Sequence, residues 1–273
     1  MDIWREIIGP PPGNRSLGRP RKTGITMVLD KGLGIAEVRD LLELAGPYID
    51  FLKLGFGTAT LYRPATLAAK VELVRAYQVD IYPGGTFLEI AIARGKLTSC
   101  LRQLREIGFT AVEVSEGSLP LDRETKDDAI KSALNAGFTV LAEVGKKNPF
   151  VCLNPLEMAR QVAADRSAGA QWVIVEGRED GCHTGLYDAQ GRVKEGFYQA
   201  FLAAVKEPAA LIWETPRKMQ QAEFINRFGP DVNLGNIPPG DVLALEAMRR
   251  GLRGDTLETI FPEMRVQTTC TSG

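Results

Sequence analysis

Histidine is nearly absent from this sequence, with one residue, His183, in a chain of 273. The four cysteines are scattered and form no CxxC pair, which argues against a disulfide framework and against a zinc site built from paired cysteines. No run approaches the roughly 20 apolar residues of a membrane-spanning helix, and the first residues lack the apolar core of a secretory signal. We therefore expect a cytoplasmic protein with reduced thiols and no membrane contact.

A charge excess of either sign is also lacking, because the formal net charge is −1. The overall field of such a chain favours neither nucleic acid nor an anionic membrane, so local positive groups must capture any anionic substrate. The apolar content of 44% is sufficient for a sizeable core. Symmetric assembly is common among soluble enzymes, and we expect a homo-oligomer that acts on small molecules.

Eight short apolar runs follow Gly24, and helical patterns separate them. The runs are Ile25–Leu29, Ile49–Leu54, Val79–Tyr82, Ala111–Val114, Thr139–Ala142, Trp172–Val175, Leu211–Trp213 and Val232–Leu234. Strands joined by crossover helices pair in parallel, and eight such units favour closure into a barrel. The alternative is an open doubly wound sheet, but the glycine-rich phosphate fingerprint expected after its first strand is missing. The sequence predicts a single TIM (β/α)₈ barrel, in one domain over residues 1–273.

Helices are predicted between these runs from apolar spacing, from Pro64 as a helix start and from glycines such as Gly137 as helix ends. Residues 87–107 are expected to contain two helical pieces broken near Gly95. Residues 1–22 carry four prolines and are predicted to form an irregular N-terminal arm across one end of the barrel. Residues 257–273 are expected to form a C-terminal tail.

A basic cluster is expected at the end of the last long helix. It consists of Arg249, Arg250 and Arg253. These cations would either complement the dipole of that helix or face a substrate phosphate. The sequence alone does not decide between these two interpretations.

Polar residues crowd the carboxyl ends of the predicted strands, where barrel enzymes build their active sites. They are Asp30, Lys31, Lys53, Tyr82, Glu113, Ser115, Glu116, Glu143, Lys146, Lys147, Glu176, Arg178, Glu214 and Asn236. Each alone could be an ion pair that closes the top of the barrel. Burying unpaired charge is costly, however, so acids that converge from several strands indicate a functional site.

The composition of this cluster indicates its chemistry. Several carboxylates and an amide, without histidine, are typical ligands of a hard cation such as Mg²⁺. The lysines and Arg178 are suited to a phosphate and a carboxylate. Glycine-rich corners at residues 55–58 and 83–86 and at Gly235 would let backbone amides approach an anion. Together these features predict a small, highly anionic substrate bound with a metal.

Many of these residues lie in motifs that follow one another in order from about Gly24 to Thr256. They are Asp30-Lys31-Gly32-Leu33, Phe51-Leu52-Lys53-Leu54-Gly55-Phe56-Gly57-Thr58, Tyr82-Pro83-Gly84-Gly85-Thr86, Val112-Glu113-Val114-Ser115-Glu116-Gly117-Ser118, Glu143-Val144-Gly145-Lys146-Lys147, Val175-Glu176-Gly177-Arg178-Glu179 and Gly251-Leu252-Arg253-Gly254-Asp255-Thr256. In these motifs the sequence resembles the phosphosulfolactate synthase family. The resemblance implies a TIM barrel, Mg²⁺ dependence and a carbon–sulfur lyase that adds sulfite to phosphoenolpyruvate. The product would be (2R)-phospho-3-sulfolactate, which serves coenzyme M synthesis or bacterial sulfolactate production.

Two positions depart from the pattern of that family. It usually has Asp where Glu116 stands, and a tryptophan or similar group often takes the place of Phe56. We therefore keep two alternatives: a barrel enzyme acting on another phosphorylated enol, and a non-catalytic relative of the plant heat-stress-associated type. The retained charges argue against the second alternative, because a scaffold has no reason to hold them together.

The expected roles follow from the family reaction. The metal ligands would be Glu113, Glu143 and Glu176. Lys146 or Lys147 would deliver the proton, and Arg178, with the amides around Gly235 and Asn236, would bind the phosphate. Lys31 and Lys53 would receive sulfite. Asp30 is also expected among the catalytic residues, and Tyr82 and Ser115 among the residues that bind substrate.

Overall fold

The computed structural model describes residues 3–15, 18–146 and 153–264. Its eight strands are β1 (Thr26–Asp30), β2 (Phe51–Leu54), β3 (Asp80–Pro83), β4 (Ala111–Val114), β5 (Thr139–Val144), β6 (Trp172–Val175), β7 (Leu211–Glu214) and β8 (Leu234–Ile237). All the ladders are parallel, and the strand order is β3-β2-β1-β8-β7-β6-β5-β4. The pairing of β1 with β8 brings the first and last strands together. The predicted TIM barrel is thus confirmed, and an open sheet is excluded.

The barrel closes between β3 and β4 without a regular ladder in the part of the chain that is described. Thr110, just before β4, joins the two edges instead. Its amide donates to the Ile81 carbonyl at 3.2 Å, and its Oγ1 accepts from the Ile81 amide at 3.0 Å. One threonine therefore satisfies both backbone groups of Ile81 at the seam.

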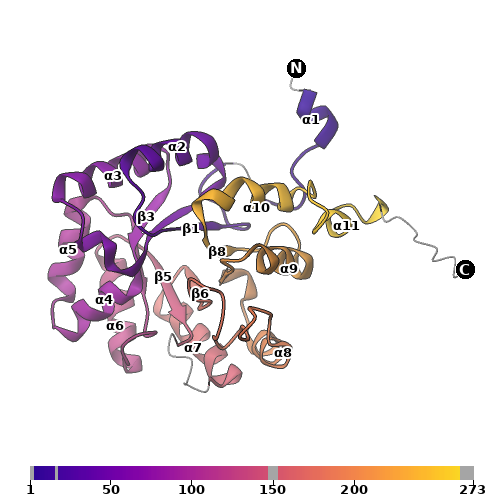
Figure 1. Ribbon diagram of the computed structural model, residues 1–273. Helices are drawn as coiled ribbons and strands as arrows, with labels where there is room; N and C mark the ends of the chain where they lie inside the picture. The colour runs from indigo at the N-terminus through magenta and orange to yellow at the C-terminus, as the bar shows by residue number, and fades with distance from the viewer. Residues whose placement is uncertain (1–2, 16–17, 147–152, 265–273) are drawn as a thin grey trace, which may run out of the picture.

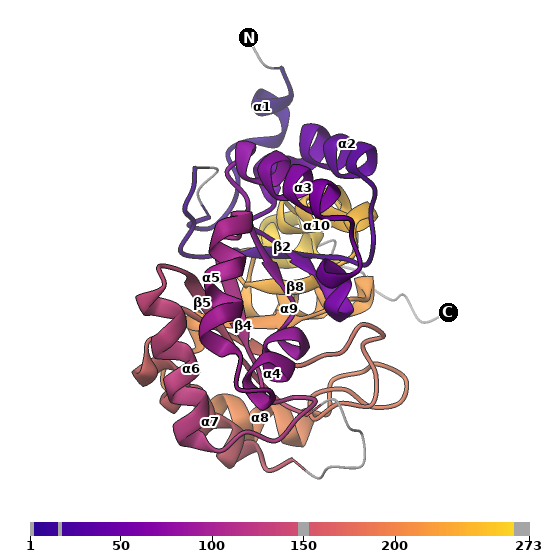
Figure 2. The same ribbon diagram turned by 90° about the vertical axis from the view of Figure 1, so that its left-hand side faces the viewer.

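Helices surround the strands (Figures 1 and 2). They are α2 (Ile35–Ala45), α3 (Pro64–Ala76), α4 (Gly85–Ala93), α5 (Leu97–Ile107), α6 (Arg123–Asn135), α7 (Pro155–Ala168), α8 (Glu195–Ala204), α9 (Lys218–Phe228) and α10 (Val242–Arg249). The break between α4 and α5 at Gly95 is as predicted, and Gly95 has a φ of +63°. None of the described helices is long and apolar enough to cross a membrane.

The last strand differs from the prediction, which placed it at Val232–Leu234. The structure has it at Leu234–Ile237, because Gly235 belongs to the strand and not to a turn. A Cβ on Gly235 would lie 2.3 Å from Met27 Cε and 3.1 Å from Ile212 Cγ2. A larger residue at position 235 would therefore force Met27 to move inside the barrel.

The interior of the barrel has an apolar floor. It is built from Ile25, Met27, Phe51, Tyr82, Ala111, Leu141, Ile174 and Ile212. The intervening strand residues, such as Val28 and Leu52, pack against the helices in the larger outer core. The two-residue period of the strands therefore separates an inner set from an outer set of side chains.

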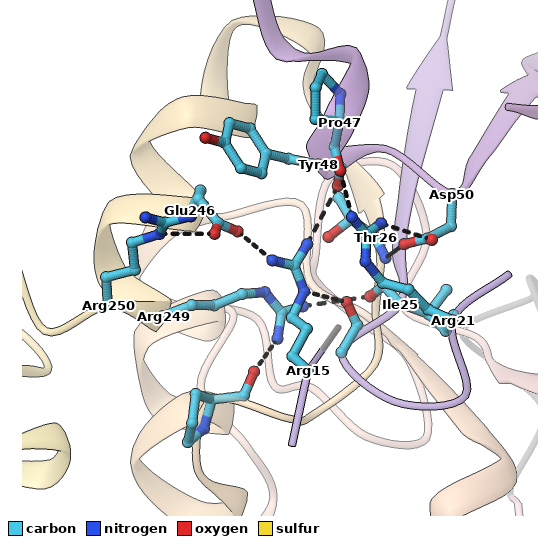
Figure 3. A network of polar contacts seen from close by, with 12 residues as sticks. Arg15, Arg21, Ile25, Thr26, Pro47, Tyr48, Asp50, Glu246, Arg249 and Arg250 are labelled. Carbon is cyan, nitrogen blue, oxygen red and sulfur yellow. Dashed lines mark hydrogen bonds and ion pairs between the residues drawn. The ribbon is translucent and has the colours of Figure 1, made fainter. Parts of the chain in front are cut away.

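The N-terminal arm lies across the amino-terminal end of the barrel, as predicted, and buried arginines fix it there (Figure 3). Arg15 donates to the Gly24 carbonyl at 2.8 Å and pairs with Glu246 at 2.5 Å. Arg21 pairs with Asp50 at 2.7 Å. The arm is not wholly irregular, because α1 (Ile3–Ile8) is helical and projects from the barrel (Figure 1).

Arg249 belongs to the same network and not to the substrate end of the barrel (Figure 3). It is 2% exposed and donates to the carbonyls of Val232, at 2.7 Å, and Ile25, at 3.2 Å. The interpretation that Arg249 faces a substrate phosphate is therefore wrong. The predicted tail contains a short helix, α11 (Leu257–Ile260), and residues 265–273 lie outside the described part of the chain.

Replacing Arg15 by Met should lower the free energy of unfolding by about 3 kcal/mol, because Glu246 stays buried and loses one of its two ion pairs within the described residues. Urea denaturation measures this change. The matched control is Arg253→Met, which breaks the more exposed pair with Asp255 and should cost at most about 1 kcal/mol. Equal losses in the two variants would contradict a stabilising role for the buried network.

Candidate active site

A layer of ionisable side chains lies directly above the apolar floor. It consists of Lys53, Glu113, Glu143, Glu176 and Glu214, none more than 7% exposed. Each comes from a different strand or follows it directly. On β2, Phe51 belongs to the apolar floor, Leu52 packs outward, and Lys53 is again inside. The strand period that builds the floor therefore also builds the charged layer.

This layer forms the base of a cavity of about 230 Å³ at the carboxyl end of the barrel. The cavity is lined by Leu29, Lys53, Gly55, Phe56, Gly84, Gly85, Thr86, Glu113, Glu143, Glu176, Arg178, Glu179, Glu214 and Asn236. A cavity of this size accommodates a small molecule but not a polymer.

Lys53 is the cation at the centre of the acids. Its Nζ lies 2.9 Å from Glu113 Oε2, 3.2 Å from Glu214 Oε1 and 3.8 Å from Glu143 Oε2. Burial by itself lowers the pKa of Lys53, but attraction to Glu113 and Glu214, with smaller effects from Tyr82 and Glu143, raises that pKa well above 10.5. Lys53 is therefore an ammonium ion at neutral pH and offsets part of the acid charge.

Backbone amides orient two of the acids. Glu113 Oε1 accepts from the Gly85 amide at 2.8 Å, and Glu214 Oε2 accepts from the Gly177 amide at 2.9 Å. A Cβ on Gly85 would lie 2.7 Å from Glu113 Oε1, so only glycine lets the start of α4 come this close. Each carboxylate thus contacts Lys53 with one oxygen and an amide with the other.

The loop after β6 contributes a cation to the cavity. Arg178 has a φ of +60°, and its amide donates to Glu176 Oε1 at 2.6 Å. Its carbonyl accepts from Asn236 Nδ2 at 3.3 Å, which holds Asn236 beside it. Asn236 Oδ1 is buried and has no hydrogen-bond partner among the described residues. The backbone of Arg178 thus connects Glu176 with Asn236.

Two further features border this cavity. An adjoining recess of about 340 Å³ shares Leu29, Glu179 and Asn236 with it and contains Lys31, whose side chain is 56% exposed and pairs with Glu179 at 3.1 Å. Lys146 follows β5, and its Nζ donates to the Glu116 carbonyl at 2.7 Å and lies 3.3 Å from Glu116 Oε1. Lys31 therefore supplies a cation in the recess, and Lys146 supplies one after β5.

Comparison with known proteins decides the family. Residues 14–255 match the family model described as (2R)-phospho-3-sulfolactate synthase (ComA). The chain belongs to the phosphosulfolactate synthase family. A phosphosulfolactate synthase of Methanothermobacter thermautotrophicus is 47% identical over 88% of this chain and 93% of its own length. Those of Methanocaldococcus jannaschii and Bacillus subtilis are 43% and 33% identical over 85% and 87% of this chain, and over 93% and 94% of their own lengths.

Solved structures with low sequence identity share the barrel. A 3-hexulose-6-phosphate synthase has a TM-score of 0.54 at 14% identity, over 83% of this chain and 98% of its own. A phosphonopyruvate hydrolase has a TM-score of 0.54 at 16% identity, over 85% of this chain and 81% of its own. At these identities the likeness concerns the fold alone.

The structure brings together most of the polar residues predicted for a phosphosulfolactate synthase site. Those that line the cavity are Lys53, Glu113, Glu143, Glu176, Arg178 and Asn236. Lys31 lies in the adjoining recess, and Lys146 is held by Glu116. Lys147 lies outside the described residues.

Asp30 does not line the cavity. Its carboxylate is fully buried, 2.6 Å from Lys70 Nζ on α3, and it accepts from the amides of Gly32 and Leu33, each at 2.7 Å. Asp30 therefore fixes the turn after β1 from the outer side of the barrel. The alternation of side chains along β1 explains this position, because Asp30 lies on the same face of the strand as Val28, which packs outward.

Three other predicted positions lie beneath or behind the cavity lining. The Tyr82 hydroxyl contacts Met27 Sδ within the apolar floor, and burial, as the largest cause, raises the pKa of Tyr82 well above 10.0. The Ser115 hydroxyl donates to Glu89, and Gly235 packs against Met27. In this structure these residues shape the walls of the site.

Sequence reasoning left out three acids that the structure places at or near the site. Glu214 was recognised as a strand-end acid but received no role, although it binds Lys53. Glu179 lines both the cavity and the recess. Glu89 is a fully buried helix residue, and no strand-end pattern identifies it. The strand period could have identified Glu214, because it lies two positions after the inward-facing Ile212 on the same strand.

A metal site made by three protein side chains is not found within the described ranges. No group of three His, Cys, Asp or Glu side chains there is arranged to hold an ion. Glu113 contacts Lys53 and the Gly85 amide, whereas Glu143 is farther from Lys53, at 3.8 Å. Apart from Glu113 and Glu214, the side chains that line the cavity and carry oxygen atoms are Thr86, Glu143, Glu176, Glu179 and Asn236.

Replacing Lys53 by Met should lower the free energy of unfolding by about 3–5 kcal/mol at pH 8, because buried carboxylates lose their cation. In the folded variant the acid layer can bind a proton, so the stability of the variant increases as the pH falls. The loss relative to the wild type should therefore be smaller at pH 5. The wild-type contribution of Lys53 should not change over this range, because its raised pKa keeps it charged until the pH rises above 10.5.

Urea denaturation of both proteins at the two pH values measures the difference. Lys31→Met is the control, because its exposed pair with Glu179 should contribute at most about 1 kcal/mol. A loss for Lys53→Met that is the same at pH 5 and pH 8 would contradict the buried charge balance.

Proposed function

We propose that this protein catalyses the Mg²⁺-dependent addition of sulfite to phosphoenolpyruvate, giving (2R)-phospho-3-sulfolactate, as a carbon–sulfur lyase of the cytoplasm. The observation that carries the proposal is the cavity of a phosphosulfolactate synthase family member, in which a buried ammonium and an arginine accompany several acids. Phosphoenolpyruvate is small and highly anionic, and it needs both a cation for its phosphate and oxygen ligands for a metal.

The cations are assigned from their places around the cavity. Arg178 is the proposed phosphate ligand, because its guanidinium is partly exposed and borders the cavity. Asn236 lies beside it and would contact the same end of the substrate. Lys31 occupies the adjoining recess, which makes that recess the proposed entry for sulfite. The two anions would then approach each other from neighbouring chambers.

The proposed Mg²⁺ ligands are the carboxylates of Glu143 and Glu176, with the buried amide oxygen of Asn236 as a further donor. Mg²⁺ is commonly held by one or two carboxylates together with substrate oxygens and water, so it does not require a three-carboxylate cluster. Glu113, the third predicted ligand, is better suited to orienting Lys53. When bound, the ion would supply a Lewis acid for the substrate carboxylate.

The reaction forms one bond between sulfur and the methylene carbon and breaks the carbon–carbon double bond. The electron pair moves toward the carboxylate, and a proton is then added to the carbon that bears the phosphate. Lys53 would stabilise the developing negative charge, since its raised pKa makes it a poor acid but a permanent cation. Lys146 or Lys147 is the proposed proton donor, and delivery from one face would fix the R configuration.

Two residues bear on the choice of nucleophile. Phe56 borders the cavity and is 58% exposed, and Glu116 binds Lys146 through both its carbonyl and its carboxylate. Because they are the positions that depart from the family pattern, a different phosphorylated enol chemistry would be expected to involve them. Sulfite remains the favoured nucleophile, because the relatives at 47% and 43% identity are named for phosphosulfolactate, the product of sulfite addition.

Purified protein with Mg²⁺, sulfite and phosphoenolpyruvate should form phosphosulfolactate, identified by mass spectrometry. Omitting sulfite or chelating Mg²⁺ should abolish the product. If no product forms while phosphoenolpyruvate still raises the melting temperature, the site is correct and the nucleophile is wrong. With neither product nor a raised melting temperature, the non-catalytic alternative would be favoured.

Replacing Lys146 or Lys147 singly by Met should lower kcat by about 10²–10⁴-fold in the variant that lacks the proton donor, and much less in the other. Each lysine is the matched control for the other, since they are adjacent and of the same type. Steady-state kinetics with both substrates measures the change. Full activity in both variants would remove the lysine proton donor from the mechanism.

A further inference from the structure

Glu89 is a buried acid whose hydrogen-bond partners within the described residues are all uncharged. It lies on α4, one turn after Gly85, and its side chain is fully buried. Burying a carboxylate costs several kcal/mol unless hydrogen bonds satisfy it. The hydrogen bonds that offset this cost therefore show what Glu89 holds in place.

The partners of Glu89 all belong to the loop that follows β4. Its Oε1 accepts from the Ser115 hydroxyl and from the Gly117 amide at 3.1 Å. Its Oε2 accepts from the amides of Ser118 at 3.1 Å and Leu119 at 2.6 Å. Three consecutive amides and one hydroxyl thus converge on a single carboxylate, which is the geometry of an anion-binding loop occupied by the protein itself.

The same loop holds Lys146 through its remaining member, Glu116. The carbonyl of Glu116 accepts from Lys146 Nζ at 2.7 Å, and its carboxylate lies 3.3 Å from that nitrogen. The backbone of Glu116 is fixed on both sides, because Ser115 and Gly117 each donate to Glu89. The position of Lys146 is thereby connected to Glu89 through two residues of one loop.

Helix α4 couples this loop to the base of the cavity. Its first residues, Gly85 and Thr86, line the cavity, and the Gly85 amide holds Glu113. Thr86 Oγ1 also lies 3.1 Å from Ser118 Oγ. The first turn of α4 therefore contacts both Glu113 at the base of the cavity and the loop that carries Glu116, the partner of Lys146.

We propose that Glu89 is a positioning residue: by ordering residues 115–119, it sets the place of Lys146 relative to the cavity. This inference rests on the proposed function for the identity of the reaction, but the physical link between Glu89 and Lys146 does not. The phosphate-binding and metal-binding groups come from other loops, so Glu89 should affect turnover more than substrate affinity.

The variant Glu89→Gln tests the proposal, since it keeps the size of the side chain but can accept with only one oxygen. We expect kcat to fall by about 10–100-fold while KM for phosphoenolpyruvate changes by less than about threefold. Glu106→Gln, an exposed glutamate on α5, is the matched control and should leave both constants unchanged. A wild-type kcat in Glu89→Gln, or a fall in activity that is entirely a rise in KM, would overturn the proposal.

A second readout does not depend on the reaction. Competitive acylation of lysines, read by mass spectrometry, should show Lys146 less reactive than the exposed Lys96 in the wild type. In Glu89→Gln the reactivity of Lys146 should rise toward that of Lys96, as it should in Glu116→Gln, where the ion pair is removed directly. Unchanged protection of Lys146 in Glu89→Gln would overturn the link even if activity falls.

If Glu89→Gln does not fold, Ser115→Ala replaces it, because this variant removes a single donor to Glu89. A smaller rise in Lys146 reactivity in Ser115→Ala supports the link, and no rise overturns it. A wild-type protein that forms no phosphosulfolactate would contradict the proposed function, whereas the acylation result would still decide whether Glu89 positions Lys146.

Discussion

The site depends on one electrostatic constraint, which is the balance between the Lys53 ammonium and the acids that surround it. Four glutamates and one lysine occupy a buried layer, and Lys53 lies within 4 Å of three of the four. Carboxylates this close together repel one another strongly at low dielectric. Lys53 lowers that repulsion, and the remaining negative charge is the reason for proposing that a divalent cation binds there with an anionic substrate.

Two further constraints act at the two ends of the barrel. At the carboxyl end, Gly85 and Gly177 let backbone amides approach the acids, where a Cβ would lie 2.3 Å from Ser115 Oγ and 2.4 Å from the Glu214 carbonyl oxygen, respectively. At the opposite end of the barrel, Arg15, Arg21 and Arg249 join the N-terminal arm to the strand starts and to α10 (Figure 3). These arginines lie away from the cavity, whereas Arg178 borders it.

The sequence predicted the barrel and the strand-end acids because both follow from periodicity and from where barrels place polar groups. The sequence pattern did not distinguish Asp30 from Glu113, because both are acids at strand ends. The structure separates them by strand parity, since Asp30 points to Lys70 on α3 and Glu113 points to Lys53. The role of Glu89 could not be predicted, because a helix glutamate that contacts a distant loop leaves no local pattern.

The central claim is that Lys53 is a permanent cation within the acid layer. The most direct test is to follow the ¹⁵Nζ resonance of Lys53 by NMR from pH 6 to pH 10, assigned by its loss in Lys53→Met. We expect an ammonium resonance that does not titrate in this range, because the pKa of Lys53 is held well above 10.5. A titration midpoint below pH 10 would show that the acids do not stabilise the charge of Lys53.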